Sequence, residues 1–178
     1  MIFVTGGSRS GKSNYALAEA AKLDGEKYFL ATCPVVDSEM QERIDKHQNF
    51  RKAMNFTTIE EETNIAQQLA SLPPGEKIVV VDCLSLWINN LLYQAEKTAQ
   101  ELDEETVRTK CTEITSVVCA LEMTRVIFVS NEVGSGIVPE NRSSRLYRDL
   151  LGTCNQVFAA AADKVVLVVC GIPVVIKQ

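Results

Sequence analysis

The strongest chemical signal in the sequence is the stretch GGSRSGKS, residues 6–13, which matches the pattern G-x-x-x-x-G-K-[ST]. In this pattern the glycines let backbone amides wrap around phosphate groups, the lysine reaches the terminal phosphate oxygens, and the last hydroxyl can ligate Mg²⁺. The match lies between an apolar run and an alanine-rich run, as a loop between a strand and a helix requires. We therefore predict a nucleoside triphosphate site, with Lys12 as a catalytic cation, formed by Gly6, Gly7, Ser8, Arg9, Ser10, Gly11, Lys12 and Ser13.

A second candidate is Asp82, which closes the apolar run 78–81. Proteins with a phosphate-binding loop keep an acid at this point, where it holds the metal ion directly or through water. Mg²⁺ prefers oxygen ligands, so Ser13 and Asp82 are the expected metal ligands. The alternative is that Asp82 only ends a strand or caps the following helix.

The only histidine of the chain, His47, lies four positions from Arg43 and four from Arg51. On a helix the three side chains would share one face. Flanking positive charge disfavours a protonated ring and leaves a neutral nitrogen that can attack phosphorus, while the guanidinium groups can hold phosphate oxygens. The alternative is an ordinary structural histidine, either solvated on a helix or satisfied in a core.

The stretch NEVGSGIVPENR, residues 131–142, combines two glycines and a proline, which predicts a shaped loop. Loops that follow the strands of a parallel sheet often carry specificity groups. Glu132, Glu140, Asn141 and Arg142 are therefore candidates for a substrate wall. The alternative is an ordinary connector.

Strand-like and helix-like segments alternate along the chain and must position these residues. Strands are expected within residues 2–5, 27–32, 54–61, 77–82, 125–132 and, as a pair, 164–177. Helices are expected within residues 12–23, from Ser38 through His47, and within 63–72, 84–97, 104–121 and 142–161. This alternation predicts an α/β fold of the P-loop NTPase type, with a mostly parallel central sheet flanked by helices and an antiparallel C-terminal edge hairpin.

Ligands bind such sheets at the carboxyl ends of the strands. Thr5, Thr32, Asp82 and Asn131 all fall at these ends. Because these strand ends share one edge of the sheet, the candidate metal ligand Asp82 is expected at the same edge as the phosphate loop.

Length and composition limit the class of protein. The 178 residues suit one compact domain, 1–178, and 46% apolar with 23% charged residues is the balance of a globular protein. A net charge of −5 argues against nucleic-acid binding. Six cysteines without a CxxC pair, and no apolar run long enough to cross a bilayer, predict reduced thiols in a cytoplasmic protein without a membrane span or leader.

Four stretches together carry a family resemblance: TGGSRSGKS, EMQERIDKHQNFR, VVVDCLSLWINNLL and NEVGSGIVPENRSSRLYRDLLGTCNQ. The chain resembles, from end to end, the bifunctional adenosylcobinamide kinase / adenosylcobinamide-phosphate guanylyltransferase family of cobalamin assembly. A phosphate loop alone would be unspecific, whereas its combination with R-I-x-x-H-x-x-x-R and N-E-V-G-x-G-I-V-P is highly specific.

The resemblance implies two reactions. The enzyme would phosphorylate adenosylcobinamide with a nucleoside triphosphate, ATP or GTP, and then transfer GMP from GTP to the new phosphate, releasing pyrophosphate through a guanylylated histidine, here His47. It also implies a homo-oligomer, a trimer, whose subunits share the corrinoid site. Beyond the phosphate loop, it places nucleotide contacts at Ala31, Thr32, Cys33, Arg43, Gln48, Asn49, Phe50, Arg51, Glu60 and Asp82.

Two other functions fit the phosphate loop. One is a GTP-binding regulator that transfers nothing to a small molecule, although the sequence lacks the guanine-reading pattern N-K-x-D. The other is a simple small-molecule kinase in which His47 is structural. A phosphoramidate is acid-labile and base-stable, so labelling with GTP would distinguish these functions from the transferase.

Overall fold

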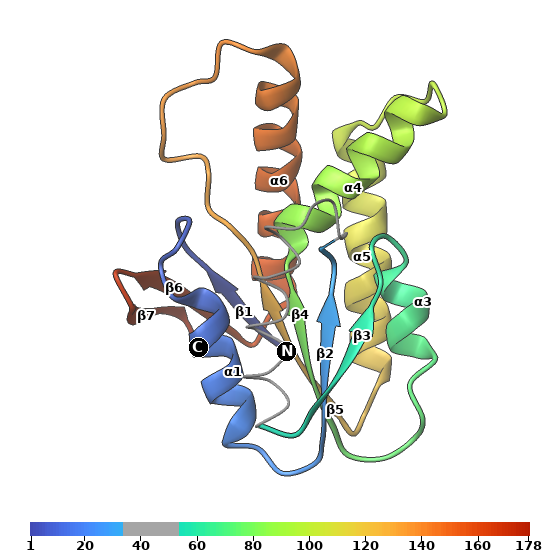
Figure 1. Cartoon of the computed structure of the whole chain (residues 1–178), viewed down its shortest axis with the longest axis vertical. Helices are drawn as coiled ribbons and strands as arrows, with labels where there is room; N and C mark the ends of the chain where they lie inside the picture. The colour runs from blue at the N-terminus through green and yellow to red at the C-terminus, as the bar shows by residue number, and fades with distance from the viewer. Residues whose placement is uncertain (34–53) are drawn as a thin grey trace, which may run out of the picture.

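The structure is a computed structural model that describes residues 1–33 and 54–178. Within these ranges the strands form one seven-stranded sheet in the order β3-β2-β4-β5-β1-β6-β7 (Figure 1). Their bounds are β1 Ile2–Thr5, β2 Glu26–Ala31, β3 Phe56–Glu60, β4 Lys77–Asp82, β5 Thr124–Val129, β6 Lys164–Val169 and β7 Ile172–Lys177.

All neighbouring strands are parallel except β6 and β7, which are antiparallel. This confirms the predicted parallel sheet with an antiparallel edge hairpin. Pro173 lies in the edge strand β7, where a missing N–H costs no interior ladder bond. The central strand β4 is buried along almost its whole length, as its uniformly apolar sequence requires.

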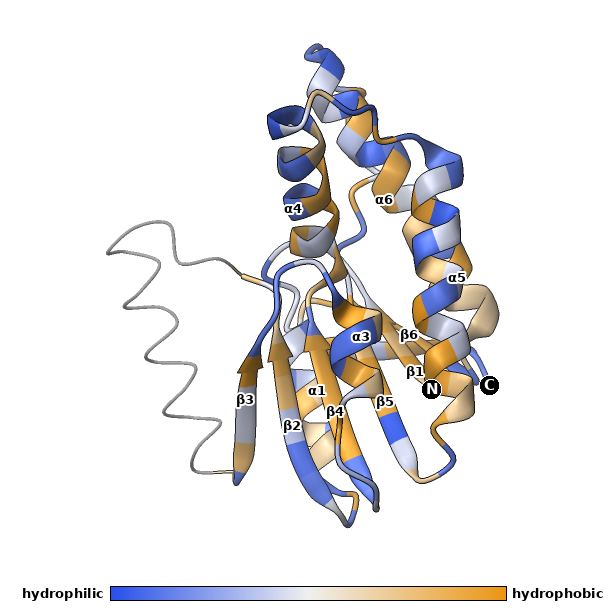
Figure 2. Cartoon of the chain, turned by 90° about the vertical axis from the view of Figure 1, so that its right-hand side faces the viewer, coloured by the Kyte–Doolittle hydropathy of each residue, from blue (hydrophilic) through white to orange (hydrophobic). Residues whose placement is uncertain are grey.

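Helices cover both faces of the sheet. Their bounds are α1 Lys12–Ala21, α3 Ile65–Ala70, α4 Leu84–Lys97, α5 Glu104–Ala120 and α6 Arg142–Ala161. Alternate residues of β4 point to opposite faces: Ile78 and Val80 pack with α1, whereas Val79 and Val81 pack with the other helices. Figure 2 shows the apolar strands between these two layers.

Helix ends agree with their sequence signals. Helices α4 and α6 have the predicted bounds, α1 and α5 end two and one residues before the predicted limit, and α3 is two residues shorter than predicted at each end. The Asp103 carboxylate accepts a hydrogen bond from the Thr106 amide, and the Asn141 side chain accepts one from the Ser144 amide, so each caps the start of a helix. The predicted helix that carries His47 lies outside the described residues.

Helices α4 and α6 extend beyond the carboxyl ends of the strands (Figure 1). They contact each other, and α6 also packs on α5. These helices therefore form walls above the sheet edge at which a ligand is expected. No helix in the described ranges has the length and apolarity to cross a membrane.

Candidate active site

The phosphate loop connects β1 to α1, as predicted. Lys12 begins α1, its side chain is buried, and its Nζ donates a hydrogen bond to the Gly7 carbonyl at 2.6 Å. The ammonium therefore lies inside the turn. Burial lowers the pKa of Lys12, and the nearby Cys83 and Asp82 act in the opposite direction. The lysine, the metal-ligand candidate and the loop thus meet at one place.

The glycines of the loop are required by close packing. Gly6 has φ +149°, and a Cβ there would lie 2.3 Å from the Val168 carbonyl oxygen. Gly11 has φ +95°, and a Cβ there would lie 3.3 Å from the Gly171 Cα. Both contacts come from the β6–β7 hairpin, whose Gly171 amide also donates to the Ser10 carbonyl at 2.8 Å. The β6–β7 hairpin therefore packs against the phosphate loop and fixes its backbone.

Two hydroxyl groups at the loop point to a polar ligand. Within the described residues, Thr5 Oγ1 and Ser10 Oγ are buried and have no hydrogen-bond partner. Buried hydroxyls without partners are unfavourable unless another molecule satisfies them. A phosphate-bearing ligand would supply acceptors at this place.

Strand register places the predicted edge residues side by side. Glu60, the last residue of β3, pairs with Ala31 of β2, and Ala31 pairs with Asp82 of β4. Thr32 follows β2 and is fully buried; its hydroxyl donates to the Cys83 carbonyl and accepts from the Cys83 amide, both at 2.8 Å. The structure thus brings Ala31, Thr32, Glu60 and Asp82 together at one sheet edge, with Cys33 next in the chain.

Asn90 on α4 holds this edge in place, and the sequence motifs did not reveal it. Its side-chain amide donates to the Thr32 carbonyl at 2.8 Å and to the Glu62 carbonyl at 3.0 Å. Trp87, one turn earlier, donates to the Thr63 carbonyl at 2.8 Å. The signal that could have identified Asn90 is an amide on the buried face of α4, which is apolar apart from Asn90 and Ser85.

A second network joins α4, α6 and the segment that follows β5; β5 ends at Val129, two residues before Asn131. The Ser85 hydroxyl accepts from the Asn131 side chain at 3.0 Å, and the Tyr147 hydroxyl donates to the Ser85 carbonyl at 3.2 Å. Asn155 donates to the Asn131 carbonyl at 2.9 Å. The Asn131 predicted at the strand end is therefore fixed from both sides.

The cysteine beside Asp82 is not suited to be a nucleophile. Burial, followed by the charge of Asp82, raises the pKa of Cys83 to about 11. The thiol stays protonated at neutral pH, and nucleophilic attack needs the thiolate. Cys83 instead hydrogen-bonds with Ser85 through its sulfur at 2.9 Å.

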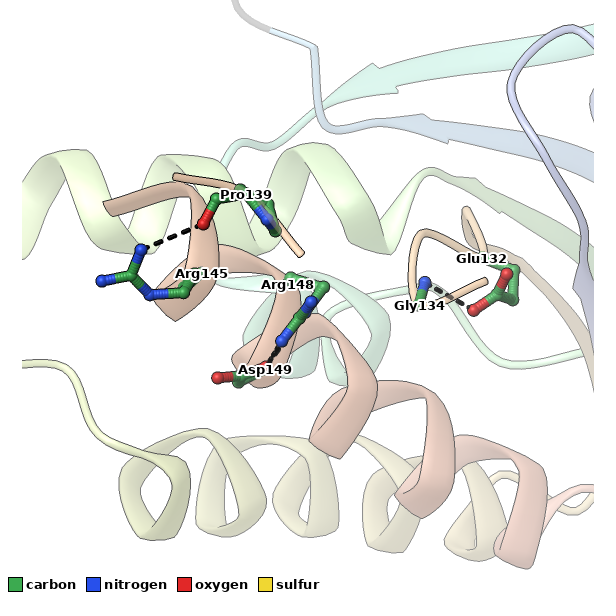
Figure 3. Close-up of polar contacts among 6 residues, drawn as sticks. All are labelled: Glu132, Gly134, Pro139, Arg145, Arg148 and Asp149. Carbon is green, nitrogen blue, oxygen red and sulfur yellow. Dashed lines mark hydrogen bonds and ion pairs between the residues drawn. The ribbon is translucent and has the colours of Figure 1, made fainter. Parts of the chain in front are cut away.

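The loop after β5 is shaped by its own polar residues (Figure 3). Glu132 accepts hydrogen bonds from the Gly134 amide at 2.6 Å and from the Ser135 amide at 3.3 Å. Arg145 donates to the carbonyls of Pro139 and Glu140, at 3.0 and 2.6 Å. The side chain of Glu132, expected as part of a substrate wall, is thus engaged in the loop itself, and that of Asn141 is engaged in the helix cap.

The donor set suits Mg²⁺. Ser13 supplies a hydroxyl and Asp82 a carboxylate, and both are hard oxygen ligands. The described residues hold no group of three or more His, Cys, Asp or Glu side chains that could bind a metal.

Six predicted site residues lie outside the described residues. They are Arg43, His47, Gln48, Asn49, Phe50 and Arg51.

Comparisons with known proteins show the family of the chain. Residues 2–176 match a family model described as cobinamide kinase / cobinamide phosphate guanyltransferase. The chain is 40% identical over 184 aligned positions to the bifunctional adenosylcobalamin biosynthesis protein CobU of Escherichia coli K12, covering 99% of each protein. It is equally similar to CobU of Salmonella typhimurium, and 37% identical to the protein CobP of Pseudomonas aeruginosa over 98% of this chain and 95% of that protein.

Solved structures show the same fold at low identity. An ATPase from a bacterial type III secretion system has a TM-score of 0.57 and 6% identity, over 93% of this chain and 50% of that one. The flagellar accessory protein FlaH of Methanocaldococcus jannaschii has a TM-score of 0.51 and 11% identity, over 99% and 77%. These likenesses support the P-loop fold alone.

Proposed function

Because the chain belongs to the cobinamide kinase / cobinamide phosphate guanyltransferase family, we propose that it catalyses both reactions on adenosylcobinamide. The first transfers the γ-phosphoryl group of ATP or GTP to the substrate hydroxyl. The second transfers GMP from GTP to the resulting phosphate. The observation that carries the proposal is the match over residues 2–176, which includes the phosphate loop, His47 and the 131–142 loop in one chain.

In the kinase step, the substrate hydroxyl oxygen attacks the γ-phosphorus, the bond to the bridging oxygen breaks, and the nucleoside diphosphate leaves. We assign to Lys12 the neutralisation of charge on the phosphate oxygens, because its ammonium lies inside the loop. Ser13 and Asp82 would hold Mg²⁺, which supplies further charge neutralisation when bound. The backbone amides of the loop would orient the phosphates.

In the transferase step, a nitrogen of His47 attacks the α-phosphorus of GTP, and pyrophosphate leaves. An oxygen of cobinamide phosphate then attacks the same phosphorus and releases the imidazole, giving adenosylcobinamide-GDP. Covalent catalysis splits one displacement into two easier ones. We assign Arg43 and Arg51 to the phosphate oxygens, since guanidinium groups bind these bidentately. The remaining nucleotide contacts proposed from sequence are Gln48, Asn49 and Phe50, with Ala31 to Cys33 and Glu60 at the sheet edge.

We also propose a cytoplasmic homo-oligomer, for which the family resemblance suggests a trimer. The edge strand β7 supports self-association, because its Ile172, Val174, Val175 and Ile176 side chains are exposed and, among the described residues, only β6 pairs with it. Exposed apolar edges of this kind are usually covered.

Labelling with GTP carrying a labelled α-phosphate tests the transferase. We expect covalent label that is lost in acid and kept in base, with an intact mass increased by one GMP. His47→Ala should abolish the label and retain phosphorylation of cobinamide, whereas the neighbouring control Lys46→Ala should keep both. Persistent label in His47→Ala would refute the role of His47. Absence of label in the unmodified protein, with phosphorylation intact, would reduce the assignment to a kinase.

A further inference from the structure

A groove runs between α4 and α6, beyond the carboxyl edge of the sheet. Its volume is about 940 Å³, which lies near the upper end of the range of roughly 300–1,000 Å³ for small-molecule sites. Residues from the outer half of α4, from the connector to α5 and from the first turns of α6 line it. The groove is therefore built on the two helices that extend furthest above the sheet (Figure 1).

The groove is continuous with the candidate active site. Three of its lining residues, Glu62, Asn90 and Tyr147, also belong to the edge networks. Asn90 donates to the Thr32 carbonyl, and the Tyr147 hydroxyl donates to the Ser85 carbonyl. Ser85 is the second residue of α4, and the segment just before this helix, Asp82–Cys83, lies near Lys12. A ligand in the groove would thus have one end facing the phosphate-binding edge.

The lining combines apolar surface with amides. Leu92, Leu146 and the two tyrosines Tyr93 and Tyr147 offer apolar and aromatic surface, and Leu146 and Tyr93 are 38% and 58% exposed. Asn89, Gln94 and Gln100 add side-chain amides. Such a lining suits a large apolar ring that carries amide groups, because amides can both donate to and accept from one another.

The charges in the groove have one sign. Glu62, Glu96 and Glu101 line it, and no lysine or arginine is among its described lining residues. The nearby Lys97 turns its Nζ to the ring of Tyr93, 4.2 Å from the centroid. An anionic ligand such as a nucleotide would be repelled here, whereas a neutral or cationic ligand would be accepted. The groove is therefore chemically distinct from the phosphate loop.

We propose that this groove binds the corrin ring of the cobinamide substrate; this inference rests on the proposed function. A corrin is a large macrocycle with an apolar face and a periphery of amides. With cobalt(III) and an adenosyl ligand, cobinamide carries a net positive charge, whereas dicyanocobinamide is neutral. The size, the amides and the carboxylates of the groove each match one of these properties.

The variant Leu146→Arg tests the groove directly, because it places a long cation against a cationic substrate. We expect the KM for adenosylcobinamide in the kinase reaction to rise at least about tenfold. The KM for GTP should rise less. Met123→Arg is the matched control, because Met123 is 58% exposed at the amino ends of the strands, outside the groove. The KM of this variant for adenosylcobinamide should equal that of the unmodified protein.

A charge test sharpens the result. Glu96→Lys should weaken binding of adenosylcobinamide, measured by equilibrium dialysis, several-fold more than binding of neutral dicyanocobinamide. Equal KM values for Leu146→Arg and the unmodified protein would overturn the inference.

The same experiments separate the inference from the proposed function. If the unmodified protein neither phosphorylates cobinamide nor becomes labelled by GTP, the proposed function fails. If it does both and Leu146→Arg leaves the KM for adenosylcobinamide unchanged, only the groove assignment fails.

Discussion

The phosphate loop and the loop after β5 both contain glycines, yet the structure uses these glycines differently. At Gly6, a Cβ would collide with the backbone of β6, and φ lies in a region that favours glycine. At Gly136 the nearest atom to a Cβ is 3.9 Å away, the carbonyl oxygen of Val133 within the same loop. The first loop is thus fixed by a distant element of the fold, whereas the second is held by side chains close to it in the sequence.

The conformation of the phosphate loop therefore depends on packing against the sheet, whereas that of the loop after β5 depends on contacts nearby in the sequence. The phosphate loop rests on the β6–β7 hairpin, which follows it by more than a hundred and fifty residues in the chain. The other loop depends on Glu132 and on Arg145 of the adjoining helix (Figure 3). Its Ile137 and Val138 remain 95% and 59% exposed. Substitutions should therefore have larger effects in the first loop.

The largest expected effect on turnover comes from Lys12→Met. This change keeps most of the side-chain length and removes the charge inside the loop, so folding should be retained. We expect kcat for cobinamide phosphorylation to fall by about 10²–10³-fold, the typical cost of removing one charge-stabilising group. Steady-state assays check this. A fall of less than tenfold would show that Lys12 does not stabilise the transferred phosphoryl group.

The largest expected effect on stability comes from Gly6→Ala. The contact with the Val168 carbonyl and the positive φ should together destabilise the fold by about 3 kcal/mol. Urea unfolding measures this value. The matched control is Gly136→Ala, which should change the free energy of unfolding by less than about 0.5 kcal/mol. Equal effects at the two glycines would contradict the proposed difference between the loops.

A smaller effect is expected from Glu132→Ala, which leaves the Gly134 and Ser135 amides without their acceptor. The cost should be about 1 kcal/mol at neutral pH. Burial acts to raise the pKa of Glu132, but the hydrogen bonds from Ser135 and Gly134 outweigh it and the pKa is lowered. The stabilisation should therefore be complete above the ordinary value of 4.5 and disappear as the pH falls through the lower folded-state pKa.

Urea unfolding at several pH values checks this prediction. The difference between the unmodified protein and Glu132→Ala should shrink as the pH falls below 4.5. A difference that stays constant down to the acid transition would mean that the Glu132 carboxylate does not hold the loop.

Local signals in the sequence predicted much of the fold. The bounds of β4, α4 and α6 follow from uninterrupted apolar runs and helical periodicity. The grouping of Glu60, Ala31 and Asp82 follows from a parallel sheet, in which strand ends meet at one edge. These features depend on short segments or on a general rule of topology.

Long-range contacts could not be predicted in the same way. The support of the phosphate loop by Gly171 joins two segments from opposite ends of the chain. Asn90 could be singled out as an amide on a buried helix face, but its hydrogen bonds depend on how α4 lies beside the ends of β2 and β3. Tyr147 has no motif around it, and its bond to Ser85 depends on how α6 packs against α4. Each of these contacts depends on how distant elements pack together, and local sequence patterns do not reveal this packing.

The most direct test of the proposed function is the product that the purified protein forms from adenosylcobinamide, GTP and Mg²⁺, identified by mass spectrometry. We expect adenosylcobinamide phosphate at early times, followed by adenosylcobinamide-GDP with release of pyrophosphate. Accumulation of adenosylcobinamide phosphate without any guanylylated product, or no conversion of the corrinoid at all, would contradict it.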